Sequence, residues 1–268
     1  MKLSEFYKIA EGFAPKSLSD EYCLKYGAYD NSGVLVDTGE EVKCVLFSLD
    51  LSKSAVKKAI DSKANLIVTH HPAIYGKIGE ISVEDTLGQK LIECIKNGIS
   101  VISMHLNLDG AKGGIDESLM EAVQLASGRK QGDRCESLMM HPLTDGGYGR
   151  AYEIEKTTAQ ALSEGLKKEL SSEKIFVYGS KKTVEKAASF CGAGGDEESV
   201  KFALSANADV IVSADFKHHV IAYAIENGLS VIQTTHYASE NYGFKKYYEK
   251  IREATNVPCV WHEDGELL

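Results

Sequence analysis

Histidines and acidic residues follow apolar segments at three places in this 268-residue chain. His70 and His71 stand side by side at the end of one apolar run, and His105 and His236 each come just after a similar run. The acids that stand four residues beyond the last two histidines are Asp109 and Glu240. Neutral imidazoles and carboxylates are suitable ligands for Zn, Mn, Fe, Co or Ni. Because an ordinary catalytic ion takes about three protein ligands, six such groups indicate two ions.

The grouping of these residues is more informative than any one of them, since an isolated histidine is usually structural. Successive side chains of a regular strand face opposite ways, so His70 and His71 can address two neighbouring ions only where the strand turns into a loop. Asp109 and Glu240 lie one helical turn or one tight loop beyond their histidines. Each carboxylate is therefore close enough to share a site, and its two oxygens can bridge two ions.

The elements that must position these groups occur twice. Asn97-Gly98-Ile99-Ser100-Val101-Ile102 is echoed by Asn227-Gly228-Leu229-Ser230-Val231-Ile232. Upstream, Val56-Lys57 precedes the run 64–69 at the spacing that separates Val200-Lys201 from the run 208–213. Each copy predicts a helix, a short apolar strand, a second helix closed by Asn-Gly, and a second strand.

This alternation of strands and helices is typical of an α/β fold with mostly parallel sheets. We expect two similar α/β lobes from an internal duplication, residues 1–130 and 131–268, with room for the C-terminal segment to pack back on the first lobe. Open sheets of this kind bind ligands at the carboxyl ends of their strands. The histidines and carboxylates stand at those ends, which predicts a metal site in the cleft between the lobes.

Local patterns give the approximate bounds of several elements. A helix is expected over 52–61 with Ser52 as its N-cap, and another over 157–170 capped by Thr157. A further helix is expected from Ser239 to about Glu253, which would put Glu240 in its first turn. Other segments are predicted from their apolar content: strands at 42–47, 66–69, 148–154, 175–178 and 187–191, and a helix at 86–96.

Two polar motifs carry less specific signals. The glycine-rich loop 191–196 leaves a predicted strand and enters a predicted helix, where backbone N–H groups can bind an anion. Asp196 and its acidic neighbours would repel a phosphate there, which favours a structural role. His218 and His219, after Asp215, could transfer protons near the cleft or could simply open a helix.

Composition excludes several classes of function. The formal net charge is -9 and basic runs are absent from the sequence, which argues against a sequence-independent grip on nucleic acid. The sequence contains no apolar stretch long enough for a membrane span and no secretory N-terminus, so we expect a cytoplasmic protein. Its 6 cysteines include no C-x-x-C pair and are expected to be reduced.

Five motifs together resemble those of the NGG-interacting factor three-like family, whose members are also described as GTP cyclohydrolase I type 2 homologues. The resemblance covers nearly the whole chain. In two places the chain departs from the family pattern: Asp215 stands where a glutamate is usual, and Thr235 where a glycine is common. The motifs are Asp30-Asn31-x-Gly33, Thr69-His70-His71-Pro72, His105-x-Asn107-Leu108-Asp109, Asp215-x-x-His218-His219 and Thr235-His236-Tyr237-Ala238-Ser239-Glu240.

The resemblance implies a dinuclear metal centre between two α/β lobes and assembly into a toroidal homohexamer. Glu240 is expected to bridge the ions, and His105 is expected to be a ligand or to lie just outside the ligands. The metal ligands that it implies are His70, His71, Asp109, His236 and Glu240.

Two functions of different class remain open from the sequence. The first is a metal-dependent hydrolase, which could open the purine ring of a nucleotide such as GTP, with His105, His218 or His219 moving protons. The second is a non-catalytic metal-binding scaffold or regulatory partner. The ligand types admit Zn, Fe, Mn, Co or Ni and do not distinguish among them.

Overall fold

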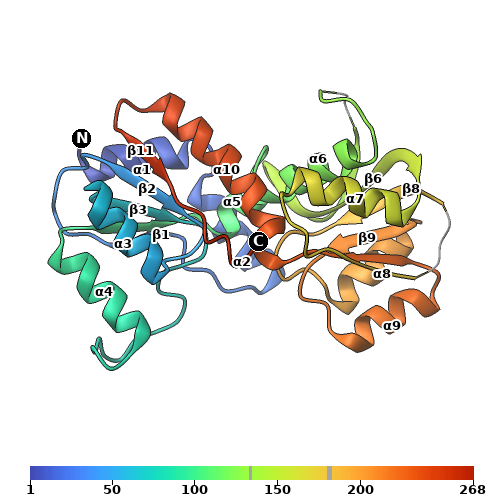
Figure 1. Cartoon of the computed structure of the whole chain (residues 1–268), viewed down its shortest axis with the longest axis horizontal. Coiled ribbons are helices and arrows are strands. Elements are labelled where there is room, and N and C mark those ends of the chain that lie inside the picture. The colour runs from blue at the N-terminus through green and yellow to red at the C-terminus, as the bar shows by residue number, and fades with distance from the viewer. Residues whose placement is uncertain (133–134, 180–182) are drawn as a thin grey trace. The chain divides into compact units, whose positions relative to one another are not determined.

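The chain is a mixed α/β protein made of two compact units (Figure 1). The computed structural model describes residues 1–132, 135–179 and 183–268. The first unit comprises Met1–Ala111 and Phe244–Gly265, and the second comprises Lys112–Gly243 and Glu266–Leu268. The division therefore falls near residue 111 and not at 130, because α6 packs against β6 and α7 of the second unit. The segment from Phe244 to Gly265 belongs to the first unit.

The first unit is built on a sheet with the strand order β1-β4-β3-β2-β11. β1 pairs antiparallel with β4, and the other pairings are parallel. Its strands are β1 (Gly33–Val36), β2 (Val45–Ser48), β3 (Leu66–Thr69), β4 (Ser100–Ser103) and β11 (Cys259–Trp261). Its helices are α1 (Leu3–Glu11), α2 (Lys16–Tyr26), α3 (Lys53–Ser62), α4 (Thr86–Lys96), α5 (Leu106–Gly110) and the later part of α10 (His236–Ala254).

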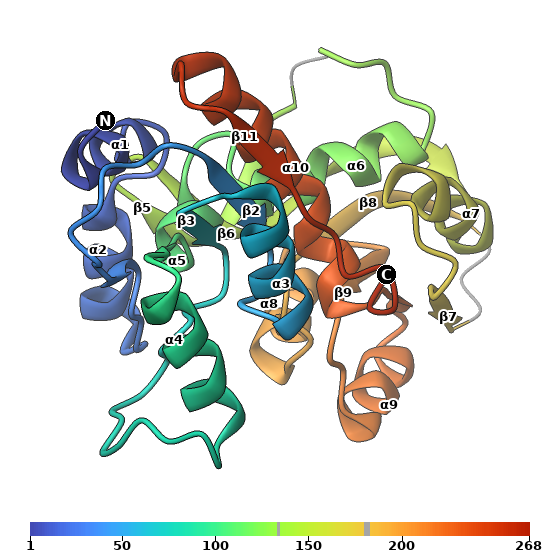
Figure 2. The same ribbon diagram turned by 60° about the vertical axis from the view of Figure 1, so that its left-hand side comes forward.

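Helices α3 and α4 cover one face of the first sheet, as Figure 2 shows. Ala55 and Val56 of α3 and Leu91 of α4 pack there against Leu46 and Ile67. Both helices have capped starts, since Ser52 accepts a hydrogen bond from Ala55 N, as expected, and Asp85 accepts one from Gly88 N. The helix expected over 86–96 is found with those bounds.

The opposite side of the first sheet is closed by aromatic residues. Phe47 of β2 contacts Phe244, Tyr247 and Tyr248 of α10, with ring centroids 5.3–6.4 Å apart. The Tyr247 hydroxyl donates to the carbonyl of Ala10 at the end of α1. Burial of these large rings fixes the position of the sheet that carries the first group of histidines.

The second unit is built on a sheet with the order β5-β6-β8-β9-β10-β7. The pairings among β8, β9 and β10 are parallel, while β5, β6 and β7 join the sheet antiparallel. Its strands are β5 (Ser137–Leu143), β6 (Gly146–Thr157), β7 (Phe176–Tyr178), β8 (Val184–Ser189), β9 (Val210–Ser213) and β10 (Ser230–Gln233). Its helices are α6 (Ile115–Ala126), α7 (Ala159–Glu169), α8 (Glu197–Ser205), α9 (His218–Glu226) and the start of α10.

Parallel pairings thus predominate in the first sheet, whereas the second sheet is mixed. The added antiparallel part begins with the hairpin of β5 and β6, whose register pairs Leu143 with Gly146. Sequence analysis missed β5 because its segment contains His141 and Pro142 and lacks a regular apolar alternation. Pro142 is tolerated because β5 lies at the edge of its sheet.

The central parts of the two units have the same order and register. The sequence β2-α3-β3-α4-β4 in the first unit corresponds to β8-α8-β9-α9-β10 in the second. Leu66 lies opposite Ser100 in the first sheet, and Val210 lies opposite Ser230 in the second. An antiparallel strand flanks each set on the same side, β1 beside β4 and β7 beside β10.

Two expected helix starts are wrong. The N-cap of α7 is Thr158 and not Thr157, because Thr157 is still paired with Val184 in the sheet. α10 begins at His236 and not near Ser239, so Glu240 stands one turn into the helix. None of the helices in the described ranges is long and apolar enough to cross a membrane.

Candidate metal centre

The first unit brings three histidine rings together at the carboxyl ends of its parallel strands. His70 and His71 follow β3, and their N–H groups both donate to the carbonyl of Leu49, at 3.1 and 3.0 Å. This shared acceptor ends the regular alternation of the strand. The ring centroid of His70 lies 4.9 Å from that of His71 and 5.1 Å from that of His105, which follows β4. Ligand atoms of the three rings lie within 4.8 Å of one another, close enough to hold a metal ion.

Each of these rings is held through its Nδ1 atom. His70 Nδ1 lies 2.7 Å from the carbonyl oxygen of Met104, and His71 Nδ1 lies 2.8 Å from Asp50 Oδ1. His105 Nδ1 lies 2.8 Å from Asp30 Oδ1. A carbonyl or carboxylate held at Nδ1 orients an imidazole so that Nε2 faces a metal.

Asp109 adds a carboxylate to this group. Its N–H donates to the carbonyl of His105 at 2.9 Å, within the short helix α5. Its Oδ1 atom lies 3.5 Å from His70 Nε2, and both residues are buried. The set of nitrogen and oxygen donors in the first unit thus fits a divalent transition metal.

Asp30 is held by several hydrogen bonds at the start of β1. Ser19 and Ser32 both donate to its Oδ2 atom at 2.5 Å. Burial alone would raise the pKa of Asp30, but hydrogen bonds from His105, Ser19 and Ser32 outweigh it and hold that pKa below its usual range. Burial likewise opposes protonation of His105, yet the bond to Asp30 and the charges of Asp109 and Asp30 raise the pKa of His105. Asp30 therefore remains a carboxylate facing His105.

Strand pairing explains why Asp30 reaches this position. β1 runs antiparallel to β4 and pairs Gly33 with Ser103, so the start of β1 lies beside the end of β4. Sequence analysis gave Asp30 no role beyond the family motif, because nothing local predicts that pairing. Asp50, which holds His71, was missed for the same reason. It follows β2 and could be found only by noting that β2 ends at the same edge as β3.

The second unit contributes a histidine and a carboxylate from one turn of α10. His236 Nε2 lies 3.1 Å from Glu240 Oε1, and His236 Nδ1 lies 2.6 Å from Asp215 Oδ2. Glu240 is buried, whereas Asp215 is about half exposed, at 52 % of its side chain. Asp215 follows β9 with a φ of 57°, an uncommon backbone conformation for a residue other than glycine. Asp215 thus holds His236 as Asp30 holds His105.

Gly192 makes the close approach of these two ligands possible. A Cβ atom at Gly192 would lie 2.2 Å from Glu240 Oε1 and 3.3 Å from His236 Nε2. The φ of Gly192 is +59°, and its N–H donates to Ser239 Oγ at 3.0 Å. At the end of the same loop, Asp196 caps α8 by accepting a hydrogen bond from Ser199 N. Sequence analysis did not connect Gly192 with Glu240.

His218 and His219 do not join the ligand groups found among the described residues. Both are exposed in the first turn of α9. His219 Nε2 lies 3.7 Å from Glu197 Oε1, and His219 lines a cavity of about 460 Å³ together with Asp215 and Lys217. The expected role of His218 and His219 in proton transfer therefore stays a prediction.

Known proteins resemble this chain over nearly its whole length. A GTP cyclohydrolase 1 type 2 homolog of Methanocaldococcus jannaschii is 33% identical over 264 residues, covering 97% of this chain and 98% of that protein. A protein of the same description from Clostridium perfringens is 30% identical, covering 94% of this chain and 92% of the relative.

Solved structures agree with the fold. Reduced HcgD from Methanocaldococcus jannaschii is 31% identical and superposes with a TM-score of 0.79, covering 97% of each chain. A Staphylococcus aureus protein, SA1388, gives a TM-score of 0.79 at 22% identity, with 98% of this chain and 96% of that chain covered, and supports the fold alone. The family model for Duf34/NIF3 (NGG1p interacting factor 3) matches residues 1–263. The resemblance drawn from the five motifs is therefore confirmed, and the chain belongs to the Duf34/NIF3 family.

Proposed function

We propose that the protein binds two divalent transition-metal ions per chain and uses them to hydrolyse a nucleotide or a related small molecule. The observation that carries this proposal is common to the four histidines: each Nδ1 atom meets a carbonyl or carboxylate oxygen. Contacts of this kind fix ring orientation and increase the basicity of the coordinating nitrogen.

The ligands in this proposal come from both units. His236 and Glu240 supply two donors, fewer than the three that a catalytic ion ordinarily takes from a protein. We therefore propose that they join the ligand candidates of the first unit in one dinuclear site, in which Glu240 would hold both ions. The proposed ligands are His70, His71, Asp109, His236 and Glu240.

Hydrolysis follows from the chemistry of the donors. Bound divalent ions supply Lewis acidity and activate water near neutral pH. His105 is placed to hold a proton, because its Nδ1 atom faces the carboxylate of Asp30. His218 and His219 are further candidates for proton transfer, and His219 shares a cavity with Asp215. GTP is the first substrate to test, because relatives of this chain are described as GTP cyclohydrolase 1 type 2 homologs.

The first experiment measures metal content. Protein reconstituted with Zn, Mn, Fe, Co or Ni should carry close to two ions per chain by elemental analysis. His236→Ala should lower the content more than His218→Ala, because only His236 is a proposed ligand. A maximum of one ion after reconstitution would refute the dinuclear proposal, and equal losses in the two variants would refute the assignment of ligands.

The second experiment measures turnover of nucleotides, phosphoesters and cyclic amides by metal-defined protein. Glu240→Gln should abolish turnover while the chain stays folded, as judged by circular dichroism. Substitution of His219 by Gln should lower the rate by roughly 100-fold with both ions retained, the usual scale of general acid–base catalysis. Absence of turnover in every metal form would favour a non-catalytic role for the centre.

Two further proposals concern origin and assembly. The shared order and register of β2-α3-β3-α4-β4 and β8-α8-β9-α9-β10 support an internal duplication. Assembly into a homohexamer rests on the family resemblance, and sedimentation velocity of the purified chain tests it. A monomer or dimer at micromolar concentration would overturn that proposal.

A further inference from the structure

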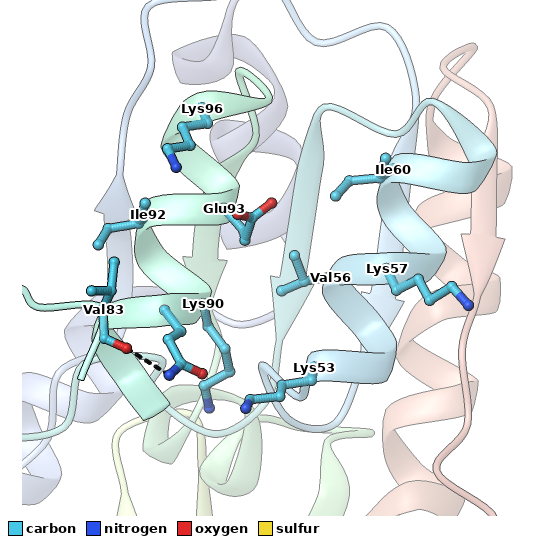
Figure 3. Close-up of a pocket in the computed structure, with 10 residues that line it drawn as sticks. Lys53, Val56, Lys57, Ile60, Val83, Lys90, Ile92, Glu93 and Lys96 are labelled. Carbon is cyan, nitrogen blue, oxygen red and sulfur yellow. Dashed lines mark hydrogen bonds between the residues drawn. The ribbon is translucent and has the colours of Figure 1, made fainter. Parts of the chain in front are cut away.

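A groove of about 460 Å³ lies between α3 and α4 on the outer side of the first unit (Figure 3). Each helix contributes residues spaced three and four apart, so one face of each helix lines it. The preceding connection adds Val83. The lining residues are Lys53, Val56, Lys57, Ile60, Val83, Gln89, Lys90, Ile92, Glu93 and Lys96.

The groove has an apolar interior and a basic rim. Val56 reaches the core of the unit, whereas Ile60 and Val83 remain 38% and 58% exposed. Among the described residues that line it, Glu93 supplies the only carboxylate against four lysines. In Figure 3 the side chains of Lys53 and Lys90 extend toward the same end of the groove.

In the part of the chain that the structure describes, ion pairs with acidic residues do not offset the positive charge of these lysines. Within the described ranges, Lys53, Lys57, Lys90 and Lys96 form no ion pair. Four ammonium groups around one apolar groove repel one another in a chain whose formal net charge is -9. Such a local excess of positive charge beside exposed apolar surface is complementary to a ligand with the opposite charge and an apolar body.

The second unit provides an internal reference for this groove. Alignment of Val56-Lys57 with Val200-Lys201 places Glu197 at the position of Lys53. Alignment of the two Asn-Gly pairs places the buried Val220 at the position of Lys90 and Glu226 at the position of Lys96. Between α8 and α9 the charges are mixed, and Lys201 lies 3.7 Å from Glu197. The shared fold therefore does not require lysine at these positions.

We propose that this groove binds a small amphipathic anion, an organic molecule with an apolar body and a carboxylate or phosphate group that Lys53 and Lys90 hold. The volume lies within the range of pockets for small molecules, about 300 to 1,000 Å³. The apolar body contacts Val56, Ile60 and Val83, and the anionic group is paired by two ammonium groups. This site is separate from the ligands of the metal centre and needs no metal.

The experiment uses the fluorescent amphipathic anion 8-anilinonaphthalene-1-sulfonate on the folded, full-length chain. The fluorescence of the bound probe should fall when decanoate or decyl phosphate is added. The competitor that binds more tightly identifies the preferred head group. Decanol, which has the same apolar body without charge, should compete at least about tenfold more weakly, because it lacks the attraction to the lysines. Equal competition by decanol and both anions would overturn the proposal.

Substitutions taken from the second unit locate the site. Lys53→Glu/Lys90→Val places there the residues that the second unit tolerates, and it should weaken probe binding by about tenfold or more. Lys53→Arg/Lys90→Arg keeps the charge and should retain binding. Lys201→Glu on α8 is the matched control and should leave binding unchanged. A loss in that control equal to the loss in Lys53→Glu/Lys90→Val, or no loss in either, would contradict the assignment, and thermal melting of each variant verifies folding.

Discussion

The two units present their metal-ligand candidates in different ways although their central strands share one register. In the first unit the donors come from separate strand ends and a short helix, and buried contacts hold His70 and His105. In the second, His236 and Glu240 come from a single turn of α10. By alignment, the position of His71 in the first unit is that of Asp215 in the second. This position thus supplies a ligand candidate, His71, in the first unit. In the second unit it supplies Asp215, the carboxylate that holds the ligand candidate His236.

What the two units have in common is the edge of the sheet at which these residues lie, and not the residue type. Asp50, His71 and His105 follow β2, β3 and β4, while Gly192, Asp215 and His236 follow β8, β9 and β10. Open α/β sheets place ligands at the carboxyl ends of their strands because the connecting loops there converge. Each unit therefore filled equivalent loops with different chemistry.

The largest expected effect on stability concerns a buried ion pair of the second unit. Arg150 Nε lies 3.1 Å from Asp116 Oδ2, and both residues are almost wholly buried in the second unit. Arg150→Met should lower the free energy of unfolding by about 3 to 5 kcal/mol, because Asp116 loses its guanidinium partner in a buried position. Urea denaturation measures it. Lys156→Met, which removes the exposed pair with Glu185, should lower the free energy of unfolding far less, because solvent screens that pair, and equal losses would contradict this expectation.

The next effect tests the tight packing that is specific to the second unit. Gly192→Ala should lower metal affinity by about 100-fold or more, because the new Cβ would lie 2.2 Å from Glu240 Oε1 and displace that carboxylate. Calorimetric titration of ion-free protein measures it. Gly228→Ala is the control, because its φ is +80° and nothing lies within 4 Å of an added Cβ. It should lower the free energy of unfolding by about 1 to 2 kcal/mol through backbone strain and leave metal affinity unchanged. Unchanged affinity in Gly192→Ala would remove Glu240 from the ligands.

A smaller effect is expected from substitution of the two carboxylates that hold His105 and His236. Asp30 has 1 % of its side chain exposed and Asp215 has 52 %. Loss of such a partner usually lowers metal affinity or activity by about 10-fold to 100-fold. Asp30→Asn should lie near the upper end of that range and Asp215→Asn near the lower, since water can replace the exposed partner. Turnover by the metal-loaded variants decides it, because Asp30 holds the proposed proton carrier His105 and Asp215 holds the proposed ligand His236. The reverse order would show that burial does not set the contribution.

The smallest expected effect tests the start of α7. Thr158→Ala should destabilise the chain by about 1 kcal/mol, because the Thr158 side chain accepts a hydrogen bond from Ala161 N. Thr157→Ala should change stability by less than about 0.5 kcal/mol, since its side chain does not cap the helix. Thermal melting of both variants measures the difference. A larger loss of stability from Thr157→Ala would show that Thr157 is the N-cap of α7, as expected from the sequence.

Features that depend on local pattern were predictable from the sequence. The strands at 66–69 and 210–213 are short apolar runs, and Ser52 stands at the start of α3 as an N-cap should. The histidines that follow the strands were identified because strand ends are visible in the pattern. α10 was expected to start near Ser239, but it begins at His236, and the buried Ser239 lies one turn inside the helix, where it accepts a hydrogen bond from Gly192 N.

Features that depend on pairing between distant segments were not predictable. Asp30 reaches His105 because β1 pairs antiparallel with β4, and Asp50 reaches His71 because β2 lies beside β3. Gly192 is required because α10 passes close to the end of β8. No short-range signal encodes these approaches, since each is decided by how the sheet assembles.

The connection between β3 and α4 is much longer than its counterpart in the second unit. Residues 70–85 make this connection in the first unit, whereas residues 214–217 suffice for the equivalent connection between β9 and α9. Closing a flexible loop costs only about 0.6 kcal/mol more for each doubling of its length, so an extension of this size costs little over about 1 kcal/mol. A long crossover at this position therefore costs the fold little, and its residues, such as Val83, are free to line the groove between α3 and α4.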